Sequence, residues 1–259
     1  MSIFDLSGRV AVVTGGNGGI GLGIAQALAE AGGTVSIWGR NADKNAQAVT
    51  SITSKGGKAE ARVCDVTDAA SVKAAMKATL DTFGRVDGCF ANAGIGGGGR
   101  HAFIDRTEED WRKMFATNLD GVFHVFQAAA RHMTERAAGG DAFGRLVATS
   151  SLASLFGTAR NEHYAATKSA INALVRALAV ELARHGVTAN AILPGWIKSD
   201  MTSGIMANEK FVANVMPRIP VRRFGEPSDF GGIAVYLMSK ASSYHTADTI
   251  LIDGGYTAF

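Results

Sequence analysis

Short apolar runs alternate along the chain with longer segments in which apolar residues recur at helical spacing. The short runs are rich in β-branched residues and continuously apolar, which is typical of parallel strands that helices cover on both faces. The sequence predicts seven strands, at 10–13, 34–38, 59–64, 86–91, 145–149, 187–192 and 249–252. It predicts helices at 20–31, 43–55, 69–83, 108–118, 121–137, 164–185 and 227–239. This alternation predicts an α/β fold with a doubly wound, seven-stranded parallel sheet.

The chain shows no composition shift that would divide it into domains. Its 259 residues, 47% of them hydrophobic, include only four prolines, and no linker or long repeat interrupts the pattern. We therefore expect a single domain over residues 1–259. Two segments lack a clean period, 94–99, which is nearly all glycine, and 199–224. The second is predicted to be either a flexible loop or a loop that closes over a substrate.

Charge and cysteine content exclude several classes of partner. Lys and Arg exceed Asp and Glu by 26 to 23 without a basic run, so we expect neither a nucleic-acid nor a membrane partner. Cys64 and Cys89 form no C-x-x-C pair and are expected to be buried and reduced, as in a cytoplasmic protein. The N-terminus does not resemble a signal peptide, and the apolar stretch 170–183 is too short to span a bilayer. The six histidines show no metal-binding spacing, so no metal is expected.

A glycine-rich turn, residues 14–21, follows the first predicted strand and opens a helix. Glycines at this place let backbone N–H groups approach a pyrophosphate at the helix N-terminus. Two registers fit: Gly16, Gly18 and Gly21, or the wider spacing of Gly15, Gly19 and Gly21. Either one predicts a dinucleotide site.

The end of the second predicted strand indicates which dinucleotide. An acidic residue, which would accept the ribose 2′-hydroxyl of NAD, is missing from Gly39-Arg40-Asn41. Arg40 suits a 2′-phosphate, so we predict NADP as the cofactor. NAD stays the less favoured alternative, since Arg40 could instead stack on the adenine and the glycine turn supplies no second cation for a phosphate.

Polar residues follow three further predicted strands. Asp65 and Val66 come after the third, Asn92, Ala93 and Gly94 after the fourth, and residues 149–151 after the fifth. Carboxyl ends of parallel strands meet at one edge of a sheet, so these residues are expected to line one crevice. Taken singly, each of these residues could instead serve only to form the turn that ends its strand.

Tyr164 and Lys168 are four residues apart in a predicted helix and therefore share a face. A nearby ammonium favours phenolate, so Lys168 is expected to lower the pKa of Tyr164. Such a phenol can serve as a general acid or base at a carbonyl or alcohol.

These motifs follow one another in the order found in the short-chain dehydrogenase/reductase family. Nearly the whole chain resembles that family, which has a Rossmann-type fold. The glycine turn matches in the wider register, and Pro194, Gly195 and Ile197 match the segment that holds the nicotinamide, with Ser199 in place of a more usual Thr. The resemblance implies the catalytic set Asn118, Ser151, Tyr164 and Lys168, in which Lys168 also binds the nicotinamide ribose and Asn118 holds a water. The candidate cofactor-binding set is Gly15, Asn17, Gly19, Ile20, Gly21, Arg40, Asn41, Asp65, Val66, Asn92, Ala93, Gly94, Tyr164, Lys168, Pro194, Gly195, Ile197 and Ser199.

These residues predict an NAD(P)(H)-dependent oxidoreductase that interconverts a ketone and a secondary alcohol. The hydroxyls of Ser151 and Tyr164 would meet the negative charge that builds on the carbonyl oxygen. Ser151 as a nucleophile is disfavoured because no G-x-S-x-G surrounds it. A dinucleotide-binding regulator without turnover is the alternative.

The resemblance also implies a homotetramer. The helix bearing Val122, Phe126, Ala129 and Ala130 is predicted to pair with helix 164–185 across a two-fold axis. The small-molecule substrate stays open between a 3-oxoacyl thioester, a sugar acid or polyol, and an alicyclic or aryl ketone. Residues 94–100, 152–163 and 199–224 are expected to line its pocket, where Arg100, Arg160 or Lys198 could meet an anion.

Overall fold

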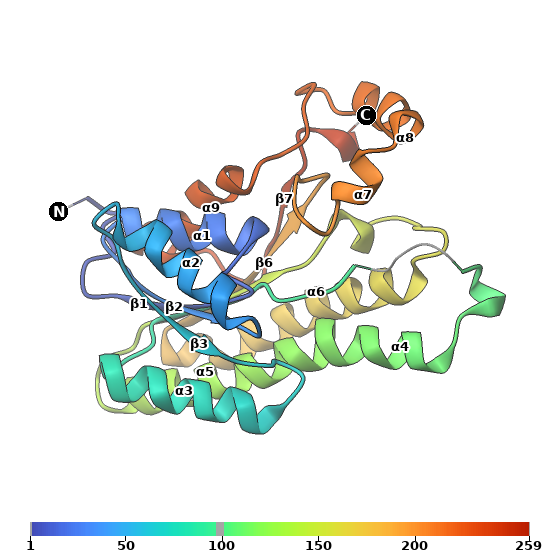
Figure 1. The fold of residues 1–259 in the computed structure, drawn as a ribbon. Coiled ribbons are helices and arrows are strands. Elements are labelled where there is room, and N and C mark those ends of the chain that lie inside the picture. The colour runs from blue at the N-terminus through green and yellow to red at the C-terminus, as the bar shows by residue number, and fades with distance from the viewer. Residues whose placement is uncertain (1, 97–100, 259) are drawn as a thin grey trace.

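Seven parallel strands form one sheet in the computed structural model, which describes residues 2–96 and 101–258 (Figure 1). The strands are β1 (Val10–Thr14), β2 (Thr34–Gly39), β3 (Lys58–Val63), β4 (Gly88–Ala91), β5 (Gly144–Thr149), β6 (Val187–Pro194) and β7 (Thr249–Ile252). Their order is β3-β2-β1-β4-β5-β6-β7. The chain therefore moves outward from β1 in one direction and from β4 in the other, and a crevice opens at that reversal, beyond the carboxyl ends of the strands. The predicted fold class is confirmed.

Helices cover both faces of the sheet. The helices are α1 (Gly19–Glu30), α2 (Ala42–Thr53), α3 (Ala69–Phe83), α4 (Glu108–Phe115), α5 (Gly121–Ala138), α6 (Glu162–Leu182), α7 (Ser203–Met206), α8 (Glu209–Val215) and α9 (Gly231–Met238). Figure 1 shows α1, α2 and α9 on one face and α3, α5 and α6 on the other. Each layer buries its own apolar core against the sheet, with Phe230 fully buried on the first side and Phe126 on the second. Both large rings are out of water, which supplies much of the driving force for this packing.

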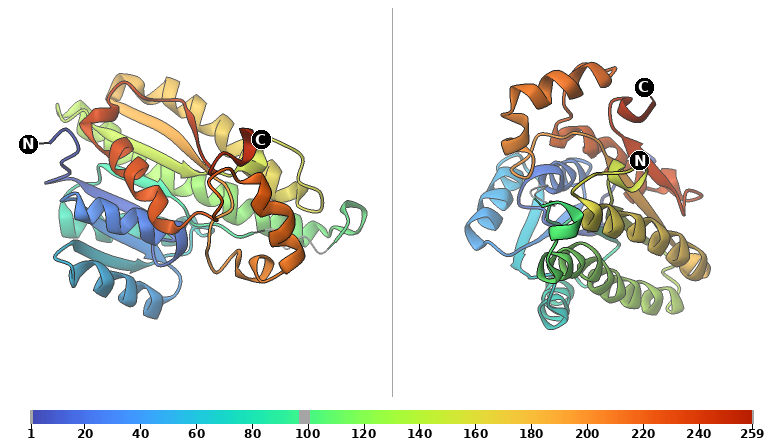
Figure 2. Two further views of the ribbon diagram at one scale, coloured as in Figure 1. Left: turned by 90° about the horizontal axis from the view of Figure 1, so that it is seen from above. Right: turned by 90° about the vertical axis from the view of Figure 1, so that its right-hand side faces the viewer.

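The segment 199–224 contains two short helices rather than a plain loop. α7 and α8 stand clear of both layers at the end of the sheet (Figure 2), and the side chain of Asn208 caps α8 by accepting a hydrogen bond from the N–H of Phe211 at 3.1 Å. Beneath them lies a third apolar cluster of Leu152, Val215, Ile219, Phe224 and Tyr256. Val215, Ile219 and Phe224 of this segment pack into that small local core, whereas Met201, Ile205 and Val221 are exposed, so the apolar residues do not follow one face of a long helix. This explains why no clean period is visible in the sequence.

The two helices predicted at 108–118 and 121–137 are joined. A π-helical turn, Ala116–Asp120, connects α4 to α5. A π turn adds a residue to one helical turn without ending the helix, so it leaves little trace in the sequence. The predicted helix at 227–239 is instead divided, into a 3₁₀ turn at Pro227–Phe230 and α9.

The predicted two-fold contact stays a prediction, and the structure divides its four residues between two faces of α5. Val122 and Ala129 are at most 3% exposed and belong to the core against the sheet. Phe126 and Ala130 line the outer groove between α5 and α6, whose other lining residues include Phe123, Leu174 and Leu178. α5 carries apolar side chains on two faces, and only the packing shows which one the sheet covers.

Cys64 and Cys89 are free and buried, as predicted, and burial raises the pKa of the Cys64 thiol to about 11. Over 2–96 and 101–258, no helix has the length and apolar character needed to cross a membrane. Within the same ranges, no cluster of histidine, cysteine and acidic residues could hold a metal ion.

Candidate active site

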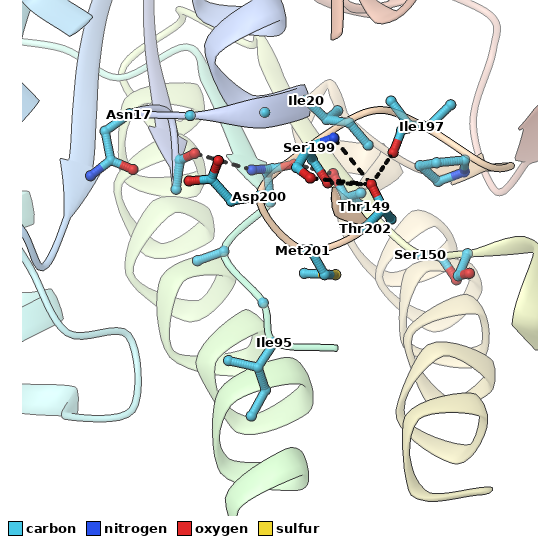
Figure 3. A pocket seen from close by; sticks show the side chains of 18 of the residues that line it. Asn17, Ile20, Ile95, Thr149, Ser150, Ile197, Ser199, Asp200, Met201 and Thr202 are labelled. Atoms are coloured by element: carbon cyan, nitrogen blue, oxygen red, sulfur yellow. Dashed lines mark hydrogen bonds between the residues drawn. The ribbon is translucent and has the colours of Figure 1, made fainter. Parts of the chain in front are cut away.

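A cavity of about 520 Å³ lies at the carboxyl edge of the sheet (Figure 3). A second cavity, of about 300 Å³, shares several of its lining residues. The larger one is lined by most of the candidate set: Gly15, Asn17, Gly19, Ile20, Arg40, Asn92, Ala93, Gly94, Ser151, Tyr164, Lys168, Pro194, Gly195, Ile197 and Ser199. Asn41, Asp65 and Val66 line the smaller one. Gly21 and Asn118 line neither, and both lie just behind the surface.

The backbone of the glycine turn favours the wider register. Gly15 and Gly19 have φ of 63° and 49°, in the left-handed region that favours glycine. A Cβ on Gly21 would overlap the carbonyl oxygen of Gly15, whereas one on Gly18 would meet nothing within 4 Å. The turn leads directly into α1, so its N–H groups and the helix N-terminus can receive a pyrophosphate.

The Asn92-Ala93-Gly94 motif holds that turn in place. The N–H groups of Asn92 and Ala93 both donate to Thr14 Oγ1 at 3.0 Å, and Asn92 Nδ2 donates to the carbonyl oxygen of Thr14 at 3.2 Å. Thr149 Oγ1 donates to Asn92 Oδ1 at 3.1 Å. β1, β4 and β5 are thus joined at their carboxyl ends by side chains, and the cavity floor is held from three strands.

The end of the crevice near β2 carries two cations. The Arg40 side chain is 70% exposed and its Nη1 lies 4.0 Å from Asp65 Oδ2. Lys44 lines both cavities together with Arg40, and its Nζ lies 2.9 Å from Asp200 Oδ2. Lys44 was missed from the sequence, because Arg40 lies before the N-cap of α2 and no helical spacing relates the two residues. The second cation that the glycine turn lacks therefore comes from α2.

Asp65 and Asn41 both have local structural roles here. Asp65 Oδ1 accepts hydrogen bonds from the N–H and hydroxyl of Thr67 at 2.9 and 2.8 Å. The backbone bond holds the pKa of Asp65 below its usual value, so the carboxylate is charged at neutral pH. Asn41 caps α2 by accepting from the N–H of Lys44 at 2.9 Å. Both residues can line a nucleotide site while also shaping its turns.

Tyr164 and Lys168 face the same cavity from the first turns of α6. Lys168 Nζ lies 5.6 Å from the centroid of the Tyr164 ring and donates to the carbonyl oxygen of Thr149 at 2.7 Å. The hydroxyl of Ser150 donates to the carbonyl oxygen of Lys168 at 3.0 Å. Hydrogen bonds from two directions thus fix α6 to the end of β5.

The predicted lowering of the Tyr164 pKa is wrong for this structure. Burial raises the pKa of Tyr164 above its ordinary value, and a hydrogen bond with the Ser151 hydroxyl offsets only part of that rise. Burial also lowers the pKa of Lys168 to about 8. The low-dielectric surroundings disfavour charge on both groups more strongly than their proximity favours it. At neutral pH the phenol therefore keeps its proton.

Ser151 and Ser150 both line the cavity, but their hydroxyls differ in availability. Ser150 Oγ is committed to Lys168, as described above. Ser151 Oγ accepts from the N–H of Ala153 at 3.1 Å and interacts with the Tyr164 hydroxyl. Ser151 is thus the serine that can act with Tyr164 on one oxygen atom.

Asn118 lies in the π turn, fully buried, and supports the wall beside Lys168. Its Oδ1 accepts from the N–H of Ile95 at 2.8 Å and its Nδ2 donates to the carbonyl oxygen of Ile95 at 2.9 Å. The same Oδ1 lies 3.2 Å, and Lys168 Nζ 3.8 Å, from the position a Cβ on Gly94 would take. These contacts give Asn118 a positioning role, and the water predicted at Asn118 stays a prediction.

The turn after β6 forms the roof of the cavity. Thr202 Oγ1 donates to the carbonyl oxygen of Ile197 at 2.6 Å and accepts from the N–H of Ser199 at 3.1 Å (Figure 3). Ile95 and Thr202 line the cavity and fall within the ranges 94–100 and 199–224 that were predicted to line the substrate pocket. No residue pattern marks these two positions individually. Of the predicted substrate-lining residues, 97–100, Arg100 included, lie outside the described residues.

Comparison with known proteins identifies the class. Residues 15–257 match a family model described as enoyl-(acyl carrier protein) reductase. The chain is 35% identical over 253 residues to the 3-oxoacyl-[acyl-carrier-protein] reductase FabG of Chlamydia pneumoniae, covering 97% of this chain and 98% of that protein. It is 36% identical over 256 residues to gluconate 5-dehydrogenase of Gluconobacter oxydans, covering 98% and 97%. A solved gluconate 5-dehydrogenase from Burkholderia cenocepacia, in complex with NADP and tartrate, superposes with a TM-score of 0.92 at 34% identity, covering 99% and 98%.

The fold and the site define a dinucleotide-dependent oxidoreductase. The chain belongs to the short-chain dehydrogenase/reductase family. The prediction of an enzyme that acts on alcohol and ketone groups is confirmed by these relatives.

Proposed function

We propose that this chain interconverts a ketone and a secondary alcohol with NADP(H), using Tyr164 as the general acid in reduction and the general base in oxidation. One observation carries the proposal: Tyr164, Ser151 and Lys168 face the same cavity as the glycine turn. A dinucleotide held by the turn can therefore present its reactive ring to the phenol. Proximity of this kind is a precondition for fast transfer.

The residues present fit NADP. The left-handed backbone at Gly15 and Gly19 leaves the turn open to a pyrophosphate, and Arg40 with Lys44 offers two cations to a 2′-phosphate. A relative of known structure was solved with NADP bound. NAD is the less favoured alternative because no carboxylate stands at the end of β2 to accept a ribose hydroxyl.

The residues of the chain act on the substrate oxygen. NADPH, when bound, supplies the hydride that reaches the carbonyl carbon. Ser151 and Tyr164 hydroxyls donate hydrogen bonds to the oxygen as negative charge builds there, and Tyr164 gives up its proton. Burial raises the pKa of Tyr164 and so keeps this proton in place until it is needed. Lys168, held by the Thr149 carbonyl, stabilises the phenolate that results, and Asn118 fixes the wall next to Lys168.

The remaining expectations belong to this proposal. Residues 199–224 close over the substrate, supported by their position on the roof of the cavity. The chain forms a homotetramer through the groove lined by Phe123, Leu174 and Leu178, because an apolar groove of this kind favours a partner. Two buried, free cysteines agree with a reducing cytoplasm.

Exchange of Tyr164 for phenylalanine tests the proposal. Tyr164→Phe removes the acid but keeps the ring, so we expect kcat for ketone reduction to fall by about 10²–10⁴-fold with NADPH affinity unchanged. The assay is the loss of reduced-nicotinamide absorbance with a panel of ketones, together with a binding titration of NADPH. Tyr236→Phe is the matched control, because its hydroxyl contacts His245 away from the cavity at 3.1 Å. A Tyr164→Phe enzyme as fast as wild type would refute the role of Tyr164 as the general acid. Binding of NADPH by wild type without turnover of any ketone would favour the alternative, a dinucleotide-binding regulator.

A further inference from the structure

A strained residue lies just before the helix that carries Tyr164. Arg160 has a φ of 63°, in the left-handed region that favours glycine, and it lies two residues before the start of α6. A residue with a Cβ adopts this conformation only where surrounding contacts hold it, and such residues cluster at functional sites. The contacts that hold Arg160 therefore also shape the start of α6.

Both backbone groups of Arg160 are bound by the two members of one ion pair. The N–H of Arg160 donates to Glu162 Oε1 at 2.8 Å, and Arg106 Nη2 donates to the carbonyl oxygen of Arg160 at 2.8 Å. The same Nη2 lies 3.7 Å from Glu162 Oε2. The guanidinium, the carboxylate and the strained residue thus form a closed ring of polar contacts.

Arg106 reaches this ring from a distant part of the chain. It lies between β4 and α4, 54 residues before Arg160, and its side chain is only 8% exposed. Its Nη2 also donates to the carbonyl oxygen of His101 at 3.4 Å. A guanidinium presents its donors in a fixed planar fork, and close packing leaves a buried one few alternative rotamers. Arg106 therefore fixes the start of α6 to the segment after β4, where α4 packs beside α6 (Figure 1).

The first turn of α6 decides where the phenol of Tyr164 points. Tyr164 is the third residue of the helix, and each residue of a helix is rotated by a fixed angle from the one before it. A shift of Glu162, the first residue, would therefore carry the phenol with it. The contacts of Lys168 and Ser150 fix the helix one turn further on. The Arg106–Glu162 pair adds a point of attachment on the N-terminal side of Tyr164.

We infer that Arg106 is a positioning residue that sets the phenol of Tyr164 for proton transfer. This inference rests on the proposed function and deepens it, because Arg106 itself lines neither cavity and would act through Tyr164 alone. Proton transfer requires donor and acceptor to be within hydrogen-bond reach, so a displacement of about 1 Å at the phenol lowers the rate about 100-fold.

Exchange of Arg106 for methionine tests the inference, since it keeps an unbranched side chain and removes its donors and charge. We expect kcat for ketone reduction to fall about 10–100-fold, with KM for the ketone and NADPH affinity within about twofold of wild type. The solvent deuterium isotope effect on kcat should rise, because proton donation by Tyr164 becomes the slow step. Arg106→Lys keeps a cation and a donor, so it should recover part of the lost kcat.

Arg136→Met is the matched control. Arg136 is also largely buried and ion-paired, with its Nη1 3.1 Å from Asp87 Oδ1. Asp87 accepts from the N–H of Val10 at the amino end of β1, so this pair lies at the edge of the sheet away from the cavity. Both variants should unfold at lower urea concentration than wild type, and only Arg106→Met should lose kcat. A loss of stability without a loss of kcat in Arg106→Met would overturn the positioning role.

A double variant tests whether Arg106 and Glu162 act on the same peptide. Glu162→Gln should lower kcat less than Arg106→Met, because the amide oxygen can still accept from the N–H of Arg160. In Arg106→Met/Glu162→Gln the two losses should not add, since either change opens the same ring. Fully additive losses would contradict a shared action on Tyr164.

Hydrogen exchange provides a readout that needs no turnover. Exchange of the backbone amides at 160–166 should be at least about tenfold faster in Arg106→Met than in wild type, with smaller changes in the rest of α6. Unchanged exchange and unchanged kcat, with Tyr164→Phe still inactive, would overturn the inference and leave the proposed function standing. A wild-type enzyme that turns over no ketone would overturn the proposed function and, with it, any role of Arg106 in turnover.

Discussion

The two ends of the crevice are built in different ways. The glycine-turn end is formed by backbone at the carboxyl ends of β1, β2 and β4, and hydrogen bonds between Thr14 and Asn92 join it. The substrate end is formed by side chains on short segments, with Met201 before α7 and Ile95 after β4. Backbone geometry demands particular residues, whereas an apolar wall accepts many. The first end is therefore readable as a motif and can serve one cofactor, while the second is free to vary with the substrate.

Gly21 provides the most severe test of this contrast. Gly21→Ala places a Cβ against the carbonyl oxygen of Gly15 and the amide of Asn92, so the turn must shift. We expect NADPH affinity to fall by about 100-fold or more, because several N–H contacts to phosphate are lost together. Isothermal titration with NADPH measures the loss.

Gly18→Ala is the control for that experiment. Its Cβ would meet nothing within 4 Å and its backbone is extended, so NADPH affinity should stay close to that of wild type. If Gly21→Ala and Gly18→Ala lowered NADPH affinity equally, the close packing around Gly21 would not be what shapes the phosphate-binding turn.

The cations of the β2 end should affect only one of the two dinucleotides. Arg40→Ala is expected to weaken NADPH binding by about 10–100-fold and leave NADH binding unchanged. Lys44→Ala should have a smaller effect in the same direction, because Lys44 already pairs with Asp200. Lys55→Ala, just beyond the C-terminal end of α2, is the matched control. Competition titrations with both dinucleotides decide the matter, and equal losses for NADH and NADPH would remove the argument for the 2′-phosphate.

Lys168 lies between the two ends, and its burial predicts an effect on stability rather than on binding alone. Because its pKa is about 8 when folded and near 10.5 when exposed, the folded state releases a proton between these values and gains stability as pH rises from 8 to 10.5. Below pH 8 the buried charge is a constant penalty. Lys168→Met should thus be more stable than wild type by about 1–3 kcal/mol at pH 7 and should lose this advantage by pH 10.5.

Urea unfolding of both proteins at pH 7 and pH 10 measures the difference. Lys113→Met, at an exposed position on α4, is the matched control. A constant gap between Lys168→Met and wild type at both pH values would show that the burial of Lys168 does not shift its titration.

Much of the fold was predictable because its rules are local. Continuous apolar runs marked most of the strands, since a strand covered on both faces has no polar side, whereas β3 alternates polar and apolar residues. The helix at 69–83 was predicted to the residue. The joined helices α4 and α5 were not predicted, because a π turn adds a residue without altering the polarity of its neighbours. α7 and α8 were not predicted either, because a local core at the end of the sheet decides which of their residues are buried.

The sequence alone determined which residues the proposed chemistry would use. The glycine turn, Asn92 to Gly94 and the Tyr164–Lys168 pair are recognisable because strained backbone and i, i+4 spacing are properties of neighbouring residues. Tertiary structure decided what those groups become. It brought Lys44 beside Arg40, gave the hydroxyl of Ser150 to Lys168 and left that of Ser151 for Tyr164, and raised the pKa of Tyr164 where spacing predicted a fall. Burial and long-range contacts set these outcomes, and both depend on segments far apart in the chain.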